Sequence, residues 1–497
     1  MSVERNLPII RERKQTILAG DAALIAEQKK AGKLTARERV ACLLDQASFV
    51  ELDALNADAG VVTGYGTIDG NPVYVYAQDF TVGGGAVGEK HARKVLKVMD
   101  MAEKTGAPIV AMLDSAGAKL DEGVQALNAY AMIAAKATEL SGVVPQVALI
   151  LGPCGGTASV IAQIADVTVQ SKNGQLFVNG PLVVSAATGK KVDMKEIAGS
   201  EASHKSGAAM LVTETDEEAA AMARKLIGML PVNNMDEAVY PETDDLNREI
   251  PQFNAIDTVD DIRDVIAAVA DNGDYIELYS EFAPSMVTAL GKIGGRTVCF
   301  IANQPNKDEG RLTVYGCKKA ARLASFADVF SIPVVTFVDS LGMKISGAPQ
   351  GELARAGASL LYALSENSAP RVAVITGQAI GMGYASMASR AVADMVYAWP
   401  GAVISAVSAP IAAQLLYADQ MDGADDPIAR RAELEQKYSD DVADGVNAAK
   451  LGYVDDVIEP AVTRQMIASA LEMLAGKREA KIAKKHGNLP LSGLKGD

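Results

Sequence analysis

The chain has 497 residues and a formal net charge of −15, with 47 basic and 62 acidic side chains. One ordinary hydrophobic core does not accommodate this length, so two or three domains are expected. The acidic balance argues against a nucleic-acid partner, because phosphate binding needs a clustered excess of lysine and arginine. Cysteine and histidine spacings match neither disulfide nor zinc frameworks, so we expect no disulfides and no metal.

The amino-terminal region predicts helices up to about residue 45. Thr35 stands before ARERVACLLD with Glu38 three positions later, which is the spacing of a capping box. The start, MSVERNLPIIRERKQ, is charged early and has no sustained apolar stretch, so it is not a secretory signal. A reducing cytoplasm is the expected compartment.

Strands and helices then alternate. Two short runs, 64–67 and 72–77, are separated by an Asp-Gly turn, which predicts a hairpin. After a helical pattern over 89–105, PIVAMLD predicts a buried parallel strand. An alanine-rich helix then leads to the strand PQVALILG and the glycine turn GPCGG, which opens the helix TASVIAQIA. The predicted unit is strand, glycine turn, helix.

The second half predicts the same elements after an acidic linker at about 231–252. IGGRTVCFIANQ predicts a hairpin, residues 317–330 a helix, PVVTFVDS and RVAVITG strands, and 381–390 a further helix. Residues 395–418 carry no charge, but two prolines interrupt them, so a buried strand-turn-helix is expected rather than a membrane span. The charged run 477–485 predicts a solvated helix.

A gapless internal repeat joins the two halves. Thr63, Gly66, Ile68, Gly70, Val73 and Ala77 recur 225 residues later as Thr288, Gly291, Ile293, Gly295, Val298 and Ala302. The register persists from Pro108, Asp114, Ser115, Gly117 and Gly156 to Pro333, Asp339, Ser340, Gly342 and Gly381. Glycine and proline fix backbone turns, so this pattern indicates an ancestral duplication and two domains of one architecture.

Common catalytic motifs are absent from the sequence, including GxSxG, HExxH and the P-loop. What recurs is a pair of glycine turns after buried strands in each half. Such turns let backbone N–H groups approach a ligand closely, and chemistry that places negative charge on a carbonyl oxygen needs such donors. Two pockets of this kind suggest two carbonyl-bearing ligands.

Long segments resemble one known family. GKLTARERVACLLDQASFVELD at 32–53, DSAGAKLDEGV from 114, SGVVPQVALILGPCGG from 141 and, near the end, GYVDDVIEPAVTR and KKHGNLPL carry the likeness. They resemble carboxyltransferase subunits of biotin-dependent acyl-CoA carboxylases and decarboxylases, of the propionyl-CoA carboxylase β and methylmalonyl-CoA decarboxylase α type. The resemblance covers nearly the whole chain.

The resemblance implies an α/β fold of two tandem crotonase-like ββα-superhelix domains, 1–240 and 241–497, in a homohexamer. The first domain would hold the coenzyme A thioester and the second would receive carboxybiotin. Carried over by position, the residues around the enolate are Ala116, Gly117, Gly155 and Gly156, and those around the biotin ureido oxygen are Gly342, Gly381 and Gly383. The implied cofactor-binding side chains are Lys119, Met343, Met382 and Tyr384.

The implied reaction moves a carboxyl group between carboxybiotin and a short-chain acyl-CoA, without an acid–base side chain. The implied partners are a biotinyl carrier protein and either a biotin carboxylase or a membrane decarboxylase subunit. Two alternatives stay open: a crotonase-fold acyl-CoA enzyme that has dropped biotin, and a non-catalytic subunit that binds acyl-CoA or a carrier. Cys154 is interpreted as buried packing, and His91 as a helix-surface or interface residue.

Departures from the family pattern lie mostly in the second half. An acidic residue is expected at Ala385 and a glutamate at Val403, and Met382 and Met343 also differ from the usual motif. In the first half Lys119 replaces an arginine, and the two are not equivalent at a bidentate contact.

Overall fold

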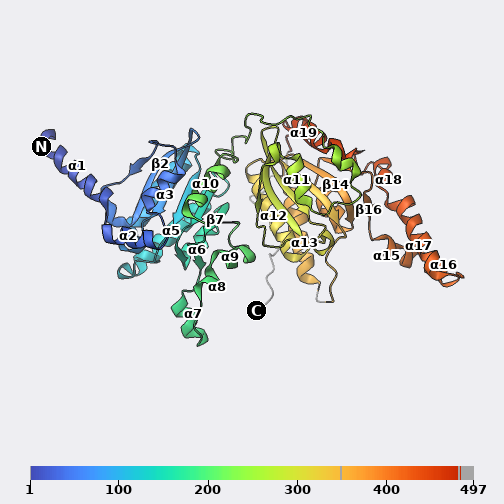
Figure 1. The fold of residues 1–497 in the computed structure, drawn as a ribbon, viewed down its shortest axis with the longest axis horizontal. Coiled ribbons are helices and arrows are strands. Elements are labelled where there is room, and N and C mark those ends of the chain that lie inside the picture. Colours follow the sequence, from blue (N-terminus) through green and yellow to red (C-terminus); the bar gives the residue numbers. More distant parts are fainter. Residues whose placement is uncertain (1, 348–349, 480–481, 483–497) are drawn as a thin grey trace. The chain divides into compact units, whose positions relative to one another are not determined.

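The computed structural model describes residues 2–347, 350–479 and 482, and the chain divides into two compact units, Met1–Glu237 and Ala238–Asp497 (Figure 1). Each unit contains a mixed sheet with helices on both faces, which agrees with the predicted α/β class.

The first unit contains ten α-helices and nine strands among its described residues. The helices are α1 (Val3–Ala19), α2 (Ala22–Lys30), α3 (Ala36–Leu43), α4 (Glu89–Thr105), α5 (Val124–Leu140), α6 (Thr157–Ala162), α7 (Pro181–Thr188), α8 (Met194–Ala198), α9 (Ser200–Ser206) and α10 (Asp216–Ile227). The strands are β1 (Val50–Leu52), β2 (Val61–Ile68), β3 (Asn71–Gln78), β4 (Ile109–Leu113), β5 (Gln146–Ile150), β6 (Pro153–Gly155), β7 (Val167–Ser171), β8 (Gln175–Phe177) and β9 (Leu211–Thr213).

The main sheet of the first unit has the order β1-β2-β3-β4-β5-β7-β9, and β6 pairs with β8 in a separate small sheet. The pairings from β1 to β3 are antiparallel, and those from β3 to β9 are parallel. Helices α3 and α10 contact each other and the sheet, while α4 and α5 pack together in the apolar core over the other face. The carboxyl ends of β4 and β5 therefore lie side by side.

The second unit repeats this plan. Its helices are α11 (Ile262–Val269), α12 (Val314–Val329), α13 (Gly351–Glu366), α14 (Met382–Met387), α15 (Ala409–Leu416), α16 (Ala418–Asp422), α17 (Pro427–Tyr438), α18 (Gly445–Lys450) and α19 (Thr463–Leu474). Its strands are β10 (Tyr275–Leu278), β11 (Met286–Ile293), β12 (Arg296–Asn303), β13 (Val334–Ser340), β14 (Arg371–Ile380), β15 (Met395–Ala398), β16 (Val403–Ser405) and β17 (Asp456–Val457). The sheet order is β10-β11-β12-β13-β14-β15-β17, with β16 beside the end of β14.

The repeat in the sequence is a repeat in the structure. Strands β2 and β3 begin at Val61 and Asn71, and β11 and β12 begin 225 residues later at Met286 and Arg296. Helices α4 and α6 have counterparts in α12 and α14 at the same offset. The duplicated pattern of turn residues therefore specifies duplicated elements.

Several local predictions are confirmed. Thr35 and Glu38 form the capping box at the start of α3. The first hairpin turns at Asp69 and Gly70, whose φ angles of 49° and 83° are those of a two-residue turn that favours glycine. The helix expected over 89–105 is α4.

Three local predictions need correction. Within the expected glycine turn GPCGG, three residues form the short strand β6, because β8 offers it a parallel partner. The uncharged stretch 395–418 holds a second strand, β16, between the expected strand and helix. Residues 477–479 are not helical, and Lys477 is largely buried against Asp394 at 2.9 Å; residues 480–481 and 483–485 lie outside the described residues. Among the described residues no helix is both long and apolar enough for a membrane span.

Each unit buries one lysine at the same place. Lys94 on α4 donates to the carbonyl oxygen of Val61 at 2.8 Å, and Lys319 on α12 donates to those of Tyr279 and Phe282 at 2.8 and 2.9 Å. Burial lowers the pKa of both, and that of Lys319 to about 7. The carbonyl oxygens hold the ammonium groups by hydrogen bonds but do not cancel their charge.

We expect Lys319→Met to change how the stability of the second unit depends on pH. The unfolded chain binds more protons at Lys319 than the folded chain between about pH 7 and the ordinary lysine pKa of about 10.4, so the free energy of unfolding rises with pH over this window. The substitution removes that rise. Trp399, the single tryptophan, lies in the second unit, and its fluorescence during urea unfolding at several pH values reports the effect. The exposed Lys450→Met is the control, and an unchanged pH dependence in Lys319→Met contradicts the prediction.

Candidate anion-binding site in each unit

In the loop after β4, the backbone N–H of Ala118 makes no hydrogen bond to a described residue. Its neighbours are all used within the unit: Ala116 N donates to Gly84 O (2.8 Å), Gly117 N to Ser115 Oγ (3.0 Å) and Lys119 N to Val87 O (2.9 Å). The N–H of Ala118, between them, makes no hydrogen bond to any described residue. Ala118 is therefore an available donor, whereas the amides of the predicted Ala116 and Gly117 are already engaged.

The turn before α6 likewise has both hydrogen-bonded and unpaired N–H groups. Gly156 N donates to Phe177 O at 3.0 Å, whereas the N–H groups of Thr157 and Ala158 make no hydrogen bond to described residues. This turn contacts the β4 loop, because Ser115 N donates to Pro153 O at 2.8 Å. The predicted Gly155 and Gly156 thus shape the turn, and the free donors follow them.

The second unit repeats the arrangement. Around Met343, Gly342 N donates to Ser340 Oγ (3.2 Å), Lys344 N to Leu312 O (3.0 Å) and Gly381 N to Ser405 O (2.9 Å). The N–H groups of Met343, Met382 and Gly383 make no hydrogen bond to described residues. Ala118 and Met343 are 225 residues apart, so the unpaired donor lies at the same register in both units.

The two donor-bearing segments of the second unit touch. A Cβ atom on Gly383 would lie 3.2 Å from Ser340 Cβ, and one on Gly342 would lie 3.0 Å from Ile380 O. Gly342 also has a φ of 84°, which favours glycine. These close approaches leave no room for side chains between the segments.

The predicted cofactor-binding side chains have different surroundings. Lys119 is exposed and lies 2.9 Å from Glu122. Tyr384 donates its hydroxyl hydrogen to Tyr453 O at 3.2 Å, and burial raises its pKa. Met343 and Met382 are partly buried beside the free amides. Met343 and Met382 themselves carry two of the unpaired N–H groups described above.

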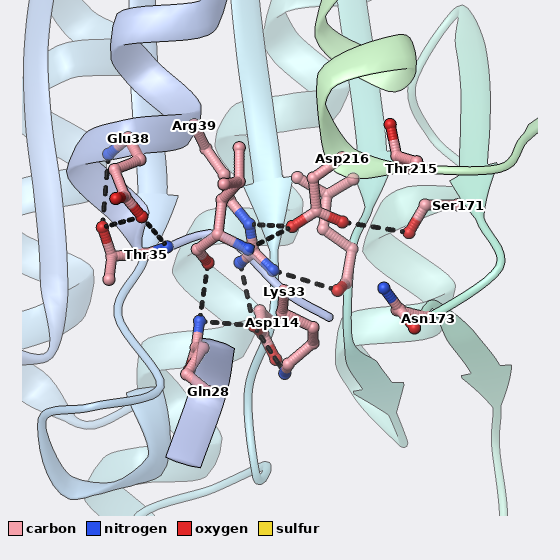
Figure 2. A network of polar contacts seen from close by, with 12 residues as sticks. Gln28, Lys33, Thr35, Glu38, Arg39, Asp114, Ser171, Asn173, Thr215 and Asp216 are labelled. Atoms are coloured by element: carbon pink, nitrogen blue, oxygen red, sulfur yellow. Dashed lines mark hydrogen bonds and ion pairs between the residues drawn. The ribbon is translucent and has the colours of Figure 1, made fainter. Parts of the chain in front are cut away.

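A buried ionic network supports the loop of the first unit (Figure 2). Arg39 Nη1 lies 2.8 Å from Asp114 Oδ2 and Arg39 Nε lies 2.7 Å from Asp216 Oδ2, with both carboxylates at most 1% exposed. Lys33 Nζ lies 2.8 Å from each oxygen of Asp114. Two cations therefore balance two carboxylates at the end of β4, directly before the loop of Ala118.

Among its described residues the second unit has no such network at the corresponding place; its buried Arg464 pairs with Asp271 instead, at 2.7 Å. Arg39 is the fourth residue of α3, and the fourth residue of α11 is Val265. Asp216 is the first residue of α10, and the first of α19 is Thr463, whose hydroxyl accepts a hydrogen bond from Trp399 at 3.0 Å. Asp339, the counterpart of Asp114, forms no ion pair with a described residue.

Asp339 is nevertheless held in place. It accepts a hydrogen bond from Gln378 N at 2.8 Å, and a Cβ on Gly377 would lie within 2.5 Å of its carboxyl group. Burial raises its pKa. The charged form of this carboxyl is therefore disfavoured, whereas its counterpart in the first unit is matched by two cations.

Neither His91 nor Cys154 is suited to acid–base chemistry. The surface interpretation of His91 is wrong: it is 2% exposed, its Nδ1 lies 3.1 Å from Ala59 O, and burial lowers its pKa to about 4. Cys154 is buried as predicted, and burial raises its pKa to about 12. All four cysteines are free, and no cluster of possible metal ligands occurs among the described residues.

Comparison with known proteins identifies the family. The model of the carboxyl transferase domain matches residues 27–489. The chain is 40% identical to methylmalonyl-CoA decarboxylase subunit alpha of Veillonella parvula, over 99% of this chain and 100% of that protein. It is 41% identical to the methylmalonyl-CoA carboxyltransferase 12S subunit of Propionibacterium freudenreichii subsp. shermanii, over 98% of each.

A solved structure agrees with this family. The transcarboxylase 12S crystal structure, described as a hexamer assembly with methylmalonyl-coenzyme A and methylmalonic acid bound, has a TM-score of 0.94 and 40% sequence identity, and 99% of each chain is covered. The protein therefore belongs to the carboxyl transferase domain family, and its two units are crotonase-like domains. The predicted family and fold are confirmed.

The sequence predicts the turns in which these N–H groups occur, but it does not indicate which N–H groups lack a partner. An N–H group has no residue signature, and Ala118 and Met343 differ as side chains although they occupy one register. Their position follows from which neighbouring amides find acceptors, and that depends on folded contacts such as Lys119 to Val87. Arg39 lies in the family-like motif GKLTARER, but nothing in the sequence paired it with Asp114 and Asp216.

We expect Arg39→Met to destabilise the first unit by about 3 to 5 kcal/mol, because two buried carboxylates lose a shared counter-ion. Urea unfolding followed by circular dichroism measures the loss, while Trp399 fluorescence reports the second unit separately. The control is Arg93→Met, which removes an exposed pair with Glu89 and should cost at most about 0.5 kcal/mol. Equal effects of the two substitutions contradict the prediction.

Proposed function

We propose that this protein is a carboxyltransferase that moves a carboxyl group between carboxybiotin, held on a separate carrier protein, and a short-chain acyl-CoA. The acyl-CoA belongs to the methylmalonyl-CoA/propionyl-CoA or the malonyl-CoA class. The first unit binds the thioester, and the second binds carboxybiotin. The observation that carries the proposal is the unpaired N–H at one register in both units, on Ala118 and Met343.

The first unit stabilises a thioester enolate. Loss of the α-proton places negative charge on the thioester oxygen, and the free amides of Ala118, Thr157 and Ala158 are fixed donors for it. A single well-placed donor of this kind is worth roughly 2.7 to 4 kcal/mol. A cavity of about 470 Å³ beside α6, lined by Val160, Phe177 and other mostly apolar residues, suits the apolar part of an acyl-CoA.

The second unit fits a ureido group. Its free donors, Met343, Met382 and Gly383, are all N–H groups, and a ureido oxygen that gains negative charge requires such donors. When bound, carboxybiotin supplies the carboxyl group, and after CO2 leaves, its ureido group supplies the base for the α-proton. The protein's residues bind and orient the two ligands and hold the charge. This division of labour suits a site where His91 and Cys154 are unavailable as acid or base.

The assembly proposed for the chain is a homohexamer that works with a biotinyl carrier protein in the cytoplasm. Either a biotin carboxylase or a membrane decarboxylase subunit completes the complex. Support comes from the relatives, whose names include both decarboxylase and carboxylase subunits, and from the hexameric transcarboxylase structure. The four free cysteines suit a reducing compartment.

The decisive test deletes one N–H at a time. Replacing Ala118 or Met343 by its α-hydroxy acid converts the amide into an ester and removes the donor while retaining the side chain. Either change should slow carboxyl transfer from methylmalonyl-CoA to free biotin by roughly 100- to 1000-fold. Calorimetry should show that the change at Ala118 weakens binding of a nitronate analogue of propionyl-CoA and that the change at Met343 weakens binding of free biotin.

Each other outcome contradicts the proposal. Turnover of methylmalonyl-CoA without biotin indicates a biotin-independent acyl-CoA enzyme. Binding of both ligands without turnover indicates a non-catalytic subunit. A reversed pattern of weakened binding assigns the ligands to the opposite units.

A further inference from the structure

Helix α13 contains a glycine, Gly357, at a buried position in its middle. Glycine in a helix interior costs roughly 1 kcal/mol relative to alanine, so a buried helical glycine calls for a structural reason. Its surroundings supply one. A Cβ atom on Gly357 would lie 3.0 Å from Cε and 3.7 Å from Sδ of Met343. The missing side chain leaves the space in which the end of Met343 lies.

The backbone of Met343 is fixed on both sides of its free amide. Gly342 N donates to Ser340 Oγ at 3.2 Å, and Lys344 N donates to Leu312 O at 3.0 Å. The side chain, packed on α13, is a third point of attachment. A larger side chain at position 357 takes the space in which the end of Met343 lies and so removes this third point of attachment.

The corresponding loop of the first unit has different packing. The loop residue there is Ala118, and α5 carries a large buried residue, Tyr130, at its seventh position, whereas the seventh position of α13 is Gly357. Tyr130 belongs to the apolar cluster against which Ala118 packs. The first unit therefore combines a small loop residue with an apolar cluster that includes a large helix residue, whereas in the second a large loop residue contacts a glycine.

We propose that Gly357 is a positioning residue for the second pocket: by lacking a side chain it lets Met343 anchor on α13, and this anchor sets the direction of the Met343 N–H. The inference rests on the proposed function for its consequence, because that N–H is the proposed donor to the ureido oxygen. Gly357 lies on a neighbouring helix, and its role does not require contact with the ligand. The two units thus differ partly in whether the loop residue or the helix residue has the large side chain.

The test uses Gly357→Leu in the full chain, with Ala358→Leu as the matched control, because Ala358 is the next residue of α13 and is exposed. Gly357→Leu should weaken free-biotin binding and slow methylmalonyl-CoA-dependent carboxylation of biotin, each by at least about tenfold, a factor that corresponds to roughly 1.4 kcal/mol. Propionyl-CoA binding should stay unchanged. Hydrogen exchange at Gly342 and Lys344, measured by mass spectrometry on peptides ending before residue 348, should become faster.

Rescue separates positioning from loss of structure. Adding Met343→Ala to Gly357→Leu restores the small-loop, large-helix combination of the first unit, and should recover slow exchange at Gly342 and Lys344 and at least part of the biotin affinity. Equal loss of biotin and propionyl-CoA binding in Gly357→Leu, unchanged exchange, or no recovery in the double variant overturns the inference. If the unmodified protein shows no biotin-dependent transfer, the proposed function fails, and the exchange measurements, which need no ligand, still decide whether Gly357 positions the loop.

Discussion

The proposed chemistry depends on one backbone N–H in each duplicated loop, that of Ala118 or Met343, which makes no hydrogen bond to a described residue. A folded backbone satisfies nearly all of its buried N–H groups, whereas those of the partly buried Ala118 and Met343 make no hydrogen bond to a described residue. Here the loop is bound to the protein through the amides on either side of Ala118 and Met343, so the free N–H cannot turn away to find another acceptor. Preorganised donors stabilise charge well because they need no rearrangement when the charge appears.

The two units support this common loop by different means. In the first, Arg39 and Lys33 bind Asp114 at the end of the strand that precedes the loop, and Asp216 balances the second cation. In the second, apolar residues such as Val265 occupy the equivalent helix position, and the loop residue packs its own side chain on α13. After duplication, the strand pairing and the turns were retained, whereas the side-chain contacts that support the loop diverged. On the proposed function, that divergence allows one architecture to serve two ligands.

Much of the fold was predictable because its signals are local. The turn at Asp69 and Gly70, the capping box at Thr35 and the glycines of both halves each fix a backbone conformation within a few residues. What could not be predicted depends on distant partners. The strand β6 exists because β8 pairs with it, His91 is buried because Ala59 offers an acceptor, and the free donor is Ala118 because its neighbours find acceptors and it does not. Such facts follow from three-dimensional proximity and carry no residue-type signal.

Electrostatics impose one requirement on both pockets, whichever ligand each receives. A site that stabilises an anion loses that benefit if an uncompensated carboxylate lies beneath it, since charges in a poorly hydrated interior interact strongly. Asp114 avoids the problem because the four charges of Lys33, Arg39, Asp114 and Asp216 sum to zero. Asp339 has no cation among the described residues, and burial raises its pKa, which disfavours the charged form that would oppose an anion. At the same point of the fold, ion pairs balance the carboxylate in one unit, and burial raises the pKa of the carboxyl in the other.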